Sequence, residues 1–237
     1  MLGEPVAVLM SYKLPVLITR FVANSPDHQE MDLRPSKILG IGVNYHAHAT
    51  EMGKQPPEEP LVFLKPPSAL VGDGDAIVRP RGYQRVDFEG ELAVVIGRRG
   101  RRIQIEEALD YVLGYSCLID VTVRDLQKKD GQWARAKGFD TFCPMGPCVV
   151  GGLDPRDLHL TTRVNGVVRQ DSSTADLIFS VPTVISFISQ AMTLEPGDVI
   201  TTGTPSGVGN LEVGDQVEVE IQGIGILHSH VVDDRAG

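Results

Sequence analysis

The sequence lacks the features that mark several large functional classes. It has no run of 18 consecutive apolar residues, so it predicts no membrane-spanning helix and no membrane partner. Lys and Arg number only 22 against 31 Asp and Glu, and the resulting net charge of −9 argues against a nucleic-acid partner. Residues 1–20 carry no basic segment before their apolar residues, and we therefore expect no signal or transit peptide.

Cysteines and nucleotide-binding motifs are also scarce. The three cysteines, Cys117, Cys143 and Cys148, include no C-x-x-C pair and cannot all form disulfides with one another. This usage is typical of a reducing compartment, so we expect a cytoplasmic protein whose thiols serve packing. The segments GIGVNY and TGTPSGVG lack the glycine spacing of a dinucleotide fingerprint, and there is no G-x-S-x-G nucleophile motif.

Glycine and proline are abundant instead, at 25 and 16 of the 237 residues. They bound short β-rich runs, whereas segments with helical periodicity are few. The sequence therefore predicts a mainly β fold with a few helices, of the α+β class. We expect a small N-terminal β extension over residues 1–35 and one larger domain, the catalytic one, over residues 36–237.

Several elements have clear local signals. The predicted strands cover residues 37–43, 61–65, 86–97 and 115–120. The predicted helices cover residues 44–53, 106–113 (ending at Gly114) and 182–192, and a further short helix follows a capping box of Thr122 and Asp125.

Acidic residues alternate along the predicted strand over residues 86–97, as Asp87, Glu89 and Glu91. At positions i, i+2 and i+4 of a strand, all three side chains point to one face. The strand continues into the apolar run LAVVIG, which is expected to enter the core, and there carboxylates would raise one another's pKa values. A divalent cation would relieve this repulsion. The alternative is a strand with one solvated face, on which such a row costs little.

Asp120 supports the metal interpretation. It ends a second apolar run, CLID, just before a predicted helix. Together with the two Glu it would form an open three-carboxylate site, which a catalytic metal needs because substrate or water must occupy the remaining positions. All ligands would be oxygen atoms, which favours Mg²⁺ or Mn²⁺, with Ca²⁺ as a substitute, over Zn²⁺.

Seven segments, in this order, resemble the fumarylacetoacetate hydrolase family, and they span about residues 36–232. They are KILGIGVNYHAHATEMG, EEPLVFLKPPSALVG, VDFEGELAVVIG, ALDYVLGYSCLIDVTVRDLQ, WARAKGFDTFCPMGP, VNGVVRQDSSTADLIF and LEPGDVITTGTPSGVG.

The resemblance implies a mixed β-sandwich roll, a homodimer, and an active site that depends on Mg²⁺ or Mn²⁺. In the family, an E-x-E strand supplies two metal ligands, which correspond here to Glu89 and Glu91. A following D-x-[ST]-x-R-D motif supplies the third, which corresponds to Asp120. Asp87 matches a common family residue, but no ligand role carries over to it.

The resemblance also implies catalytic and substrate-binding residues. The family's H-x-x-E pair, which activates water, corresponds to His48 and Glu51, and at i and i+3 of a helical turn the carboxylate can orient the imidazole. On the residues alone, a surface His beside a surface Glu is the commoner interpretation. The family lysine that stabilises an oxyanion or enolate corresponds to Lys137. Residues that match positions near the substrate carboxylate are Arg124, Gln127 and Thr204.

The family cleaves or rearranges 2-oxo acids. The chain is therefore predicted to be a divalent-metal-dependent C–C hydrolase or decarboxylase that acts on a small 2-oxo or 2,4-dioxo acid through a metal-bound enolate. Acylpyruvates and acids like fumarylacetoacetate or oxaloacetate are the expected substrates. One alternative is an isomerase of a 2-hydroxydienedioate in aromatic (homoprotocatechuate) catabolism, which needs only proton transfer. An alternative of another class is a non-catalytic module that binds small acids.

Overall fold

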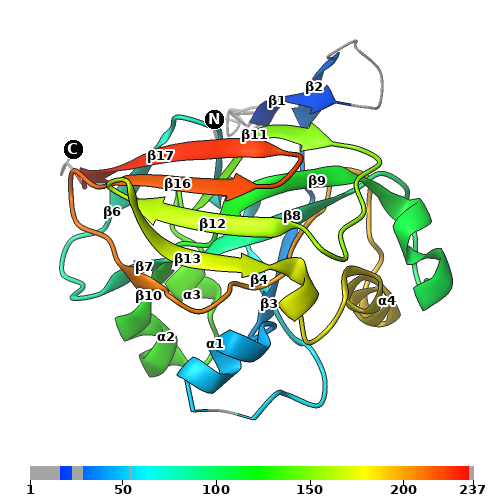
Figure 1. Ribbon diagram of the computed structural model, residues 1–237, viewed down its shortest axis with the longest axis horizontal. Helices are drawn as coiled ribbons and strands as arrows, with labels where there is room; N and C mark the ends of the chain where they lie inside the picture. Colours follow the sequence, from blue (N-terminus) through cyan, green and yellow to red (C-terminus); the bar gives the residue numbers. More distant parts are fainter. Residues whose placement is uncertain (1–16, 23–28, 54, 235–237) are drawn as a thin grey trace, which may run out of the picture.

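β-Strands dominate the described part of the chain, as the sequence predicts, and there they form three sheets (Figure 1). The computed structural model describes residues 17–22, 29–53 and 55–234. In spatial order, the nine-stranded sheet contains β2 (Gln29–Leu33), β1 (Leu17–Val22), β11 (Cys143–Val150), β9 (Val112–Ile119), β8 (Gly90–Ile96), β14 (Val199–Thr201), β3 (Ile38–Gly42) and β4 (Leu61–Lys65), with β5 (Leu70–Val71) paired to β11.

The second large sheet has five strands, and a small third sheet has three. The five-stranded sheet contains β13 (Val167–Ser173), β12 (His159–Val164), β16 (Gln216–Ile221), β17 (Gly225–Asp233) and β6 (Ala76–Arg79). The three-stranded sheet contains β10 (Thr122–Val123), β7 (Val86–Phe88) and β15 (Gly209–Asn210).

Helices are short and lie outside the sheets. The α-helices are α1 (His46–Glu51), α2 (Arg124–Asp130), α3 (Ala134–Lys137) and α4 (Val181–Ala191), and the 3₁₀ helices are η1 (Pro67–Ala69), η2 (Ile105–Tyr111) and η3 (Thr174–Asp176). Figure 1 shows α1, α2 and α3 gathered at one end of the sheets. No helix in the described part of the chain is long and apolar enough to cross a membrane.

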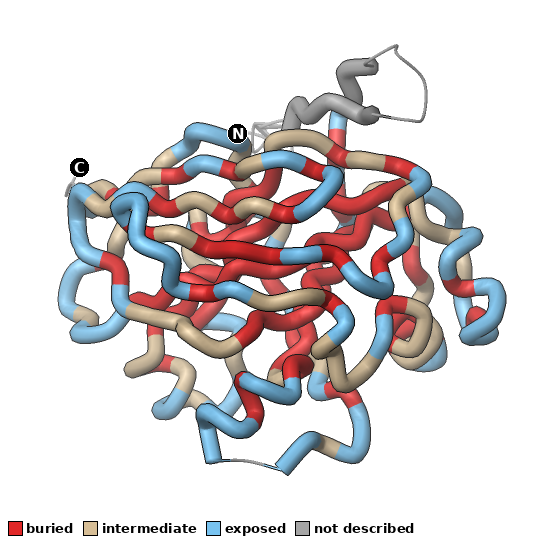
Figure 2. The backbone as a smooth tube through the Cα atoms, viewed as in Figure 1, coloured by how far each residue is buried: buried red, intermediate tan, exposed pale blue. Residues whose placement is uncertain are grey.

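The core lies between the two large sheets. Every residue of β8 is buried, whereas β16 alternates between buried and more exposed residues, as a strand with one core face does. The sheets approach closely: a Cβ added at Gly90 would lie 2.0 Å from Oγ1 of Thr162. Figure 2 shows the buried stretches concentrated along the middle of the strands and the exposed ones at the turns. The arrangement is the predicted sandwich of mixed sheets, with parallel and antiparallel pairs in the larger one.

The predicted N-terminal β extension lies partly outside the described residues. Its described part contains β1 and β2, which pair with each other in antiparallel fashion. β1 also pairs in parallel with β11 and so continues the edge of the nine-stranded sheet.

The predicted strand over residues 86–97 is wrong as one continuous strand. β7 pairs with β10 and β15, whereas β8 pairs with β9 and β14, so the chain changes sheets at Glu89. The break matters because it places Glu89 at the junction of two sheets.

Two further local predictions are wrong in detail. The helix expected over residues 106–113 is the 3₁₀ helix η2, and Gly114 lies inside β9 instead of ending a helix. A Cβ at Gly114 would lie 2.6 Å from the carbonyl oxygen of Val150, so this glycine permits close strand packing. The capping box does not form. The Thr122 hydroxyl donates to the backbone carbonyl of Asp120 and accepts from Lys137, and Asp125 accepts from the backbone amides of Gln84 and Arg85, in the loop before β7.

Candidate active site

Three carboxylates meet where β8 begins and β9 ends. Oxygen atoms of Glu89, Glu91 and Asp120 lie within 4.8 Å of one another, and all three residues are buried. Glu89 and Glu91 flank Gly90 and face the same side, as strand periodicity predicts. The antiparallel pairing of β8 with β9 then brings in Asp120, whose backbone N–H donates to the Glu89 carbonyl oxygen at 2.8 Å.

Two buried lysines contact this cluster. Lys137, at the end of α3, donates from Nζ to Glu89 at 2.8 Å, to Asp120 at 2.5 Å and to the Thr122 hydroxyl at 2.8 Å. Lys65, at the end of β4, donates to the other oxygen of Asp120 at 2.7 Å and to the backbone carbonyl of Lys137 at 2.5 Å. Lys65 therefore holds both the third carboxylate and the segment that carries Lys137.

Arg124, the first residue of α2, joins the cluster to Asp87. Its guanidinium donates to Asp87 at 2.7 Å, to Glu89 at 2.5 Å and to the side-chain oxygen of Gln127 at 2.8 Å. Asp87 is fully buried and also accepts from Arg85 at 2.8 Å. The first carboxylate of the acidic row is thus not part of the three-carboxylate cluster, and its ion pair orients the Arg124 guanidinium that also contacts Glu89.

The charges within the cluster are unevenly balanced. Burial raises the pKa of Glu89, but the charges of Lys137 and Arg124 lower it below its ordinary value overall. Burial, followed by the charges of Asp120 and Glu89, raises the pKa of Glu91 to about 8. The neighbouring cations therefore leave Glu91 without full compensation.

A divalent cation fits this donor set. The three ligating groups are all carboxylates, the ligand type that Mg²⁺, Mn²⁺ and Ca²⁺ prefer. Their spacing suits a small ion, because oxygens on opposite sides of an ion bound at about 2.1 Å are about 4.2 Å apart. Glu89, Glu91 and Asp120 are therefore the residues that could hold a metal.

The His48–Glu51 pair forms as the i, i+3 spacing predicts. On α1, Nδ1 of His48 lies 3.0 Å from Oε2 of Glu51, and the other carboxylate oxygen of Glu51, Oε1, accepts the backbone N–H of Gly207 at 3.2 Å. The Glu51 side chain is 43% exposed but that of His48 only 9%, so the ring is not a surface histidine. The backbone N–H of Ala47 donates to Asp176 at 3.1 Å, which fixes the start of α1 to η3.

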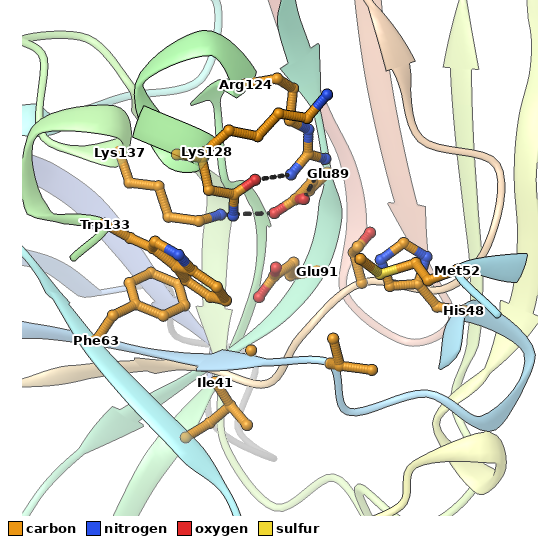
Figure 3. A pocket seen from close by; sticks show the side chains of 14 residues that line it. Ile41, His48, Met52, Phe63, Glu89, Glu91, Arg124, Lys128, Trp133 and Lys137 are labelled. Carbon is orange, nitrogen blue, oxygen red and sulfur yellow. Dashed lines mark hydrogen bonds and ion pairs between the residues drawn. The ribbon is translucent and has the colours of Figure 1, made fainter. Parts of the chain in front are cut away.

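A cavity of about 340 Å³ joins the acidic cluster to this pair. Figure 3 shows Glu89, Arg124 and Lys137 on one side, Glu91 near the middle, and His48 with Met52 on the opposite side. Of the nine site residues predicted from the sequence, seven line the cavity: His48, Glu89, Glu91, Arg124, Gln127, Lys137 and Thr204. The other two contact lining residues from behind, Asp120 through Lys137 and Glu51 through His48.

Thr204 lines the cavity, but its hydroxyl is engaged elsewhere. It donates to the carbonyl oxygen of Gly90 at 2.9 Å and accepts from the side-chain amide of Gln170 at 2.7 Å. A hydroxyl contact with a substrate carboxylate would require Thr204 to give up its bond to Gly90.

Sequence reasoning assigned no role to Lys65 or to the apolar wall of the cavity. That wall includes Phe63 and Trp133, whose ring centroids lie 5.3 Å apart. A local signal existed for Lys65: it lies two residues after Phe63 on β4, so both face the same side. No pattern in the residues around Trp133, which follows α2, predicts that its ring packs against Phe63.

Comparisons with known proteins agree with this arrangement. The family model described as fumarylacetoacetate (FAA) hydrolase C-terminal matches residues 37–232. An uncharacterised protein of Methanocaldococcus jannaschii is 53% identical over 86% of this chain and 86% of its own length. Oxaloacetate tautomerase YisK of Bacillus subtilis is 46% identical over 84% of this chain and 70% of its own length.

A solved structure extends the similarity to three dimensions. The crystal structure of fumarylpyruvate hydrolase from Pseudomonas aeruginosa, in complex with Mn²⁺ and pyruvate, superposes with a TM-score of 0.83. It is 34% identical and covers 94% of this chain and 99% of that one.

Proposed function

The chain belongs to the fumarylacetoacetate hydrolase family, and on this basis we propose that it is a divalent-metal-dependent enzyme that cleaves a C–C bond of a small 2-oxo or 2,4-dioxo acid, by hydrolysis or decarboxylation. One observation carries the proposal: a buried three-carboxylate cluster and a His–Glu pair face each other across a single cavity. The first suits a cation and the second suits a base, and the cavity has room for a small acid between them.

The metal ligands in this proposal are Glu89, Glu91 and Asp120. A bound Mg²⁺ or Mn²⁺ would supply positive charge to the 2-oxo and carboxylate oxygens of the substrate and so favour the enolate. The Mn²⁺ and pyruvate named for the Pseudomonas aeruginosa enzyme support this choice of ion and of substrate class.

The remaining roles follow from the contacts of each side chain. His48, oriented by Glu51, would accept a proton from water that attacks the distal carbonyl group. Although burial lowers the pKa of Lys137, the charges of Asp120 and Glu89 raise it above its ordinary value, so Lys137 would act as a fixed positive charge beside the developing oxyanion. Arg124 and Gln127 would bind the substrate carboxylate, and Thr204 would help to close that end of the site.

A second candidate reaction is keto–enol tautomerisation, or the related isomerisation of a 2-hydroxydienedioate. The similarity to oxaloacetate tautomerase YisK favours it. This reaction needs the same enolate and a group that moves a proton, but it needs no attacking water. Membership of the family also leads us to propose a cytoplasmic homodimer, which light scattering of the purified chain would test.

Proton NMR of acetylpyruvate and, separately, oxaloacetate would test the function. Each substrate is incubated with the full chain and Mg²⁺ or Mn²⁺, with EDTA and the metal alone as controls. The variant Lys137→Gln should lose activity, and Glu107→Gln, an exposed residue on η2, should keep it.

The products distinguish the candidates. Metal-dependent acetate and pyruvate from acetylpyruvate would support a hydrolase, and pyruvate from oxaloacetate above the metal blank would support a decarboxylase. Faster exchange between enol and keto oxaloacetate without new products would support the tautomerase. Shifts in melting temperature without any turnover would overturn the enzyme proposal in favour of a binding module.

A further inference from the structure

Gln170 is a buried side chain that joins the two large sheets beside the acidic cluster. It lies on β13 of the five-stranded sheet, across from β8 of the nine-stranded sheet, and is 1% exposed (Figure 1). Its side-chain oxygen accepts the backbone N–H of Gly90, at the start of β8, at 2.9 Å. Its side-chain nitrogen donates to the Thr204 hydroxyl at 2.7 Å and to the carbonyl oxygen of Pro205 at 2.9 Å. Gln170 therefore bonds both to the strand of Glu89 and Glu91 and to a residue that lines the cavity.

The backbone groups around Gln170 fix the orientation of its amide. The N–H of Gly90 can only donate, and the carbonyl group of Pro205 can only accept. The side-chain oxygen must therefore face Gly90, and the NH₂ group must face Pro205 and Thr204. Because an NH₂ group only donates, the Thr204 oxygen has to accept from it. The proton of the Thr204 hydroxyl must then point to a different acceptor.

That proton has a choice of two directions. In this structure it is donated to the carbonyl oxygen of Gly90 at 2.9 Å. Thr204 also lines the cavity, so a turn of its hydroxyl would direct the proton to a ligand carboxylate while the bond from Gln170 persists. A hydrogen bond to an ionised acceptor is about twice as strong as one between neutral groups. A bound carboxylate would therefore compete well with the Gly90 carbonyl for this proton.

The loop that carries this hydroxyl is also held by other contacts. The backbone N–H of Gly203 donates to Glu91 at 2.8 Å. Gly207 lies so close to β13 that an added Cβ would be 2.0 Å from the carbonyl oxygen of Arg169. These contacts do not involve the Gln170 amide, so the loop should keep its place when that amide is removed. The hydroxyl would lose the donor that fixes the direction of its proton.

We infer that Gln170 is a positioning residue that makes the Thr204 hydroxyl a donor to the carboxylate of the bound 2-oxo acid. The inference rests on the proposed function, because it places an anionic ligand at the end of the cavity where Thr204 lies. Gln170 itself does not line the cavity, so it acts on the ligand through Thr204. Without the amide, the hydroxyl could turn a lone pair toward the ligand, which a carboxylate would repel.

A double-mutant cycle on ligand binding tests this inference. The full chain is loaded with Mn²⁺ and titrated with pyruvate by calorimetry. We expect Thr204→Val to weaken pyruvate binding roughly tenfold and Gln170→Met roughly fivefold, changes typical of a charged and a neutral hydrogen bond. The double variant should bind pyruvate no more weakly than Thr204→Val, because no hydroxyl is left to orient. Independent effects would instead multiply to about fiftyfold. Thr204→Ser, which keeps the hydroxyl, should bind pyruvate nearly as the wild type does.

A spectroscopic measurement on the wild type does not depend on whether the variants fold. In the Mg²⁺-loaded chain, pyruvate should shift the side-chain NH₂ resonances of Gln170, because a hydroxyl that donates to a charged group becomes a better acceptor itself. Gln222 is the internal control. Its side chain also accepts a backbone N–H, that of His159 at 3.4 Å, but it is exposed and does not line the cavity. Its resonances should stay in place, and Gln222→Met should bind pyruvate as the wild type does.

The outcomes separate this inference from the proposed function. A fiftyfold loss in the double variant, or Gln170 resonances that pyruvate does not shift, would overturn the role of Gln170. Loss of Mn²⁺ binding in Gln170→Met would also overturn it, because the amide would then serve to hold the strand of metal ligands through Gly90. In these cases the proposed function stands if the wild type binds pyruvate in a metal-dependent way. If the Mn²⁺-loaded wild type binds no pyruvate, the proposed function and this inference both fail.

Discussion

Replacing Glu91 with Gln should make the metal-free protein more stable and abolish its response to metal. Glu91 lies 1% exposed between two other carboxylates, and burial together with their charges raises its pKa to about 8. Gln is nearly isosteric and neutral. Its side-chain oxygen can accept the backbone N–H of Gly203, which Glu91 accepts at 2.8 Å, and its amide can donate to Glu89 or Asp120.

The magnitude follows from the difference in pKa between the folded and unfolded states. The ordinary value for this carboxyl group is 4.5, against about 8 in the folded chain. At pH 7, folding therefore has to protonate Glu91, which lowers the free energy of unfolding by about 3 kcal/mol. The Gln variant should recover about this amount in the absence of metal.

The sign of the pH dependence is fixed by the same values. Below pH 4.5 the group is protonated in both states, so the two proteins should differ little. Between pH 4.5 and about 8 only the folded state keeps the proton, so the wild type loses stability relative to the variant as pH rises. Above that window the difference should level off.

Urea unfolding with EDTA, repeated from pH 4.5 to 8.5, measures the gain in stability without metal. Thermal melting with increasing Mn²⁺ measures the response to metal, because an ion that binds only the folded state raises the melting temperature. Glu107→Gln, an exposed substitution of the same kind, controls for the lost charge. A Glu91→Gln protein that is less stable than wild type without metal, or that still gains stability from Mn²⁺, would refute the reasoning.

Three further predictions concern the surroundings of the cluster. Lys65→Met should lower the free energy of unfolding, measured in urea, by about 3 kcal/mol. This value is at the low end for a broken buried ion pair, because Asp120 keeps its ion pair with Lys137. A change below about 0.5 kcal/mol would contradict the prediction. Glu51→Gln should slow acetylpyruvate hydrolysis more than oxaloacetate decarboxylation, since only hydrolysis needs activated water; equal losses would argue against that role. Asp87→Asn should raise KM roughly tenfold while Mn²⁺ affinity stays near wild type, because Arg124 loses its anchor but the three ligands stay; a fall in Mn²⁺ affinity alone would place Asp87 among the ligands.

Local sequence determined those features that depend on a few neighbouring residues. Glu89 and Glu91 face one side because strand residues alternate, and His48 meets Glu51 because helix positions i and i+3 are adjacent. The strand over residues 61–65 and the helix beginning near Pro182 were predictable from composition and periodicity for the same reason. The mainly β class likewise follows from the spacing of Gly and Pro.

Tertiary structure decided which of these local faces meet. Asp120 lies beside Glu89 and Glu91 only because of the register of β8 with β9. Asp87 belongs to a different sheet, since the chain changes sheets at Glu89, and it is not part of the cluster. Lys65 and Lys137 come from separate segments, and each is buried only because the other elements close around it. Periodicity specifies the side on which a residue lies, but the partner across that side is set by long-range packing, which no local window of the sequence contains.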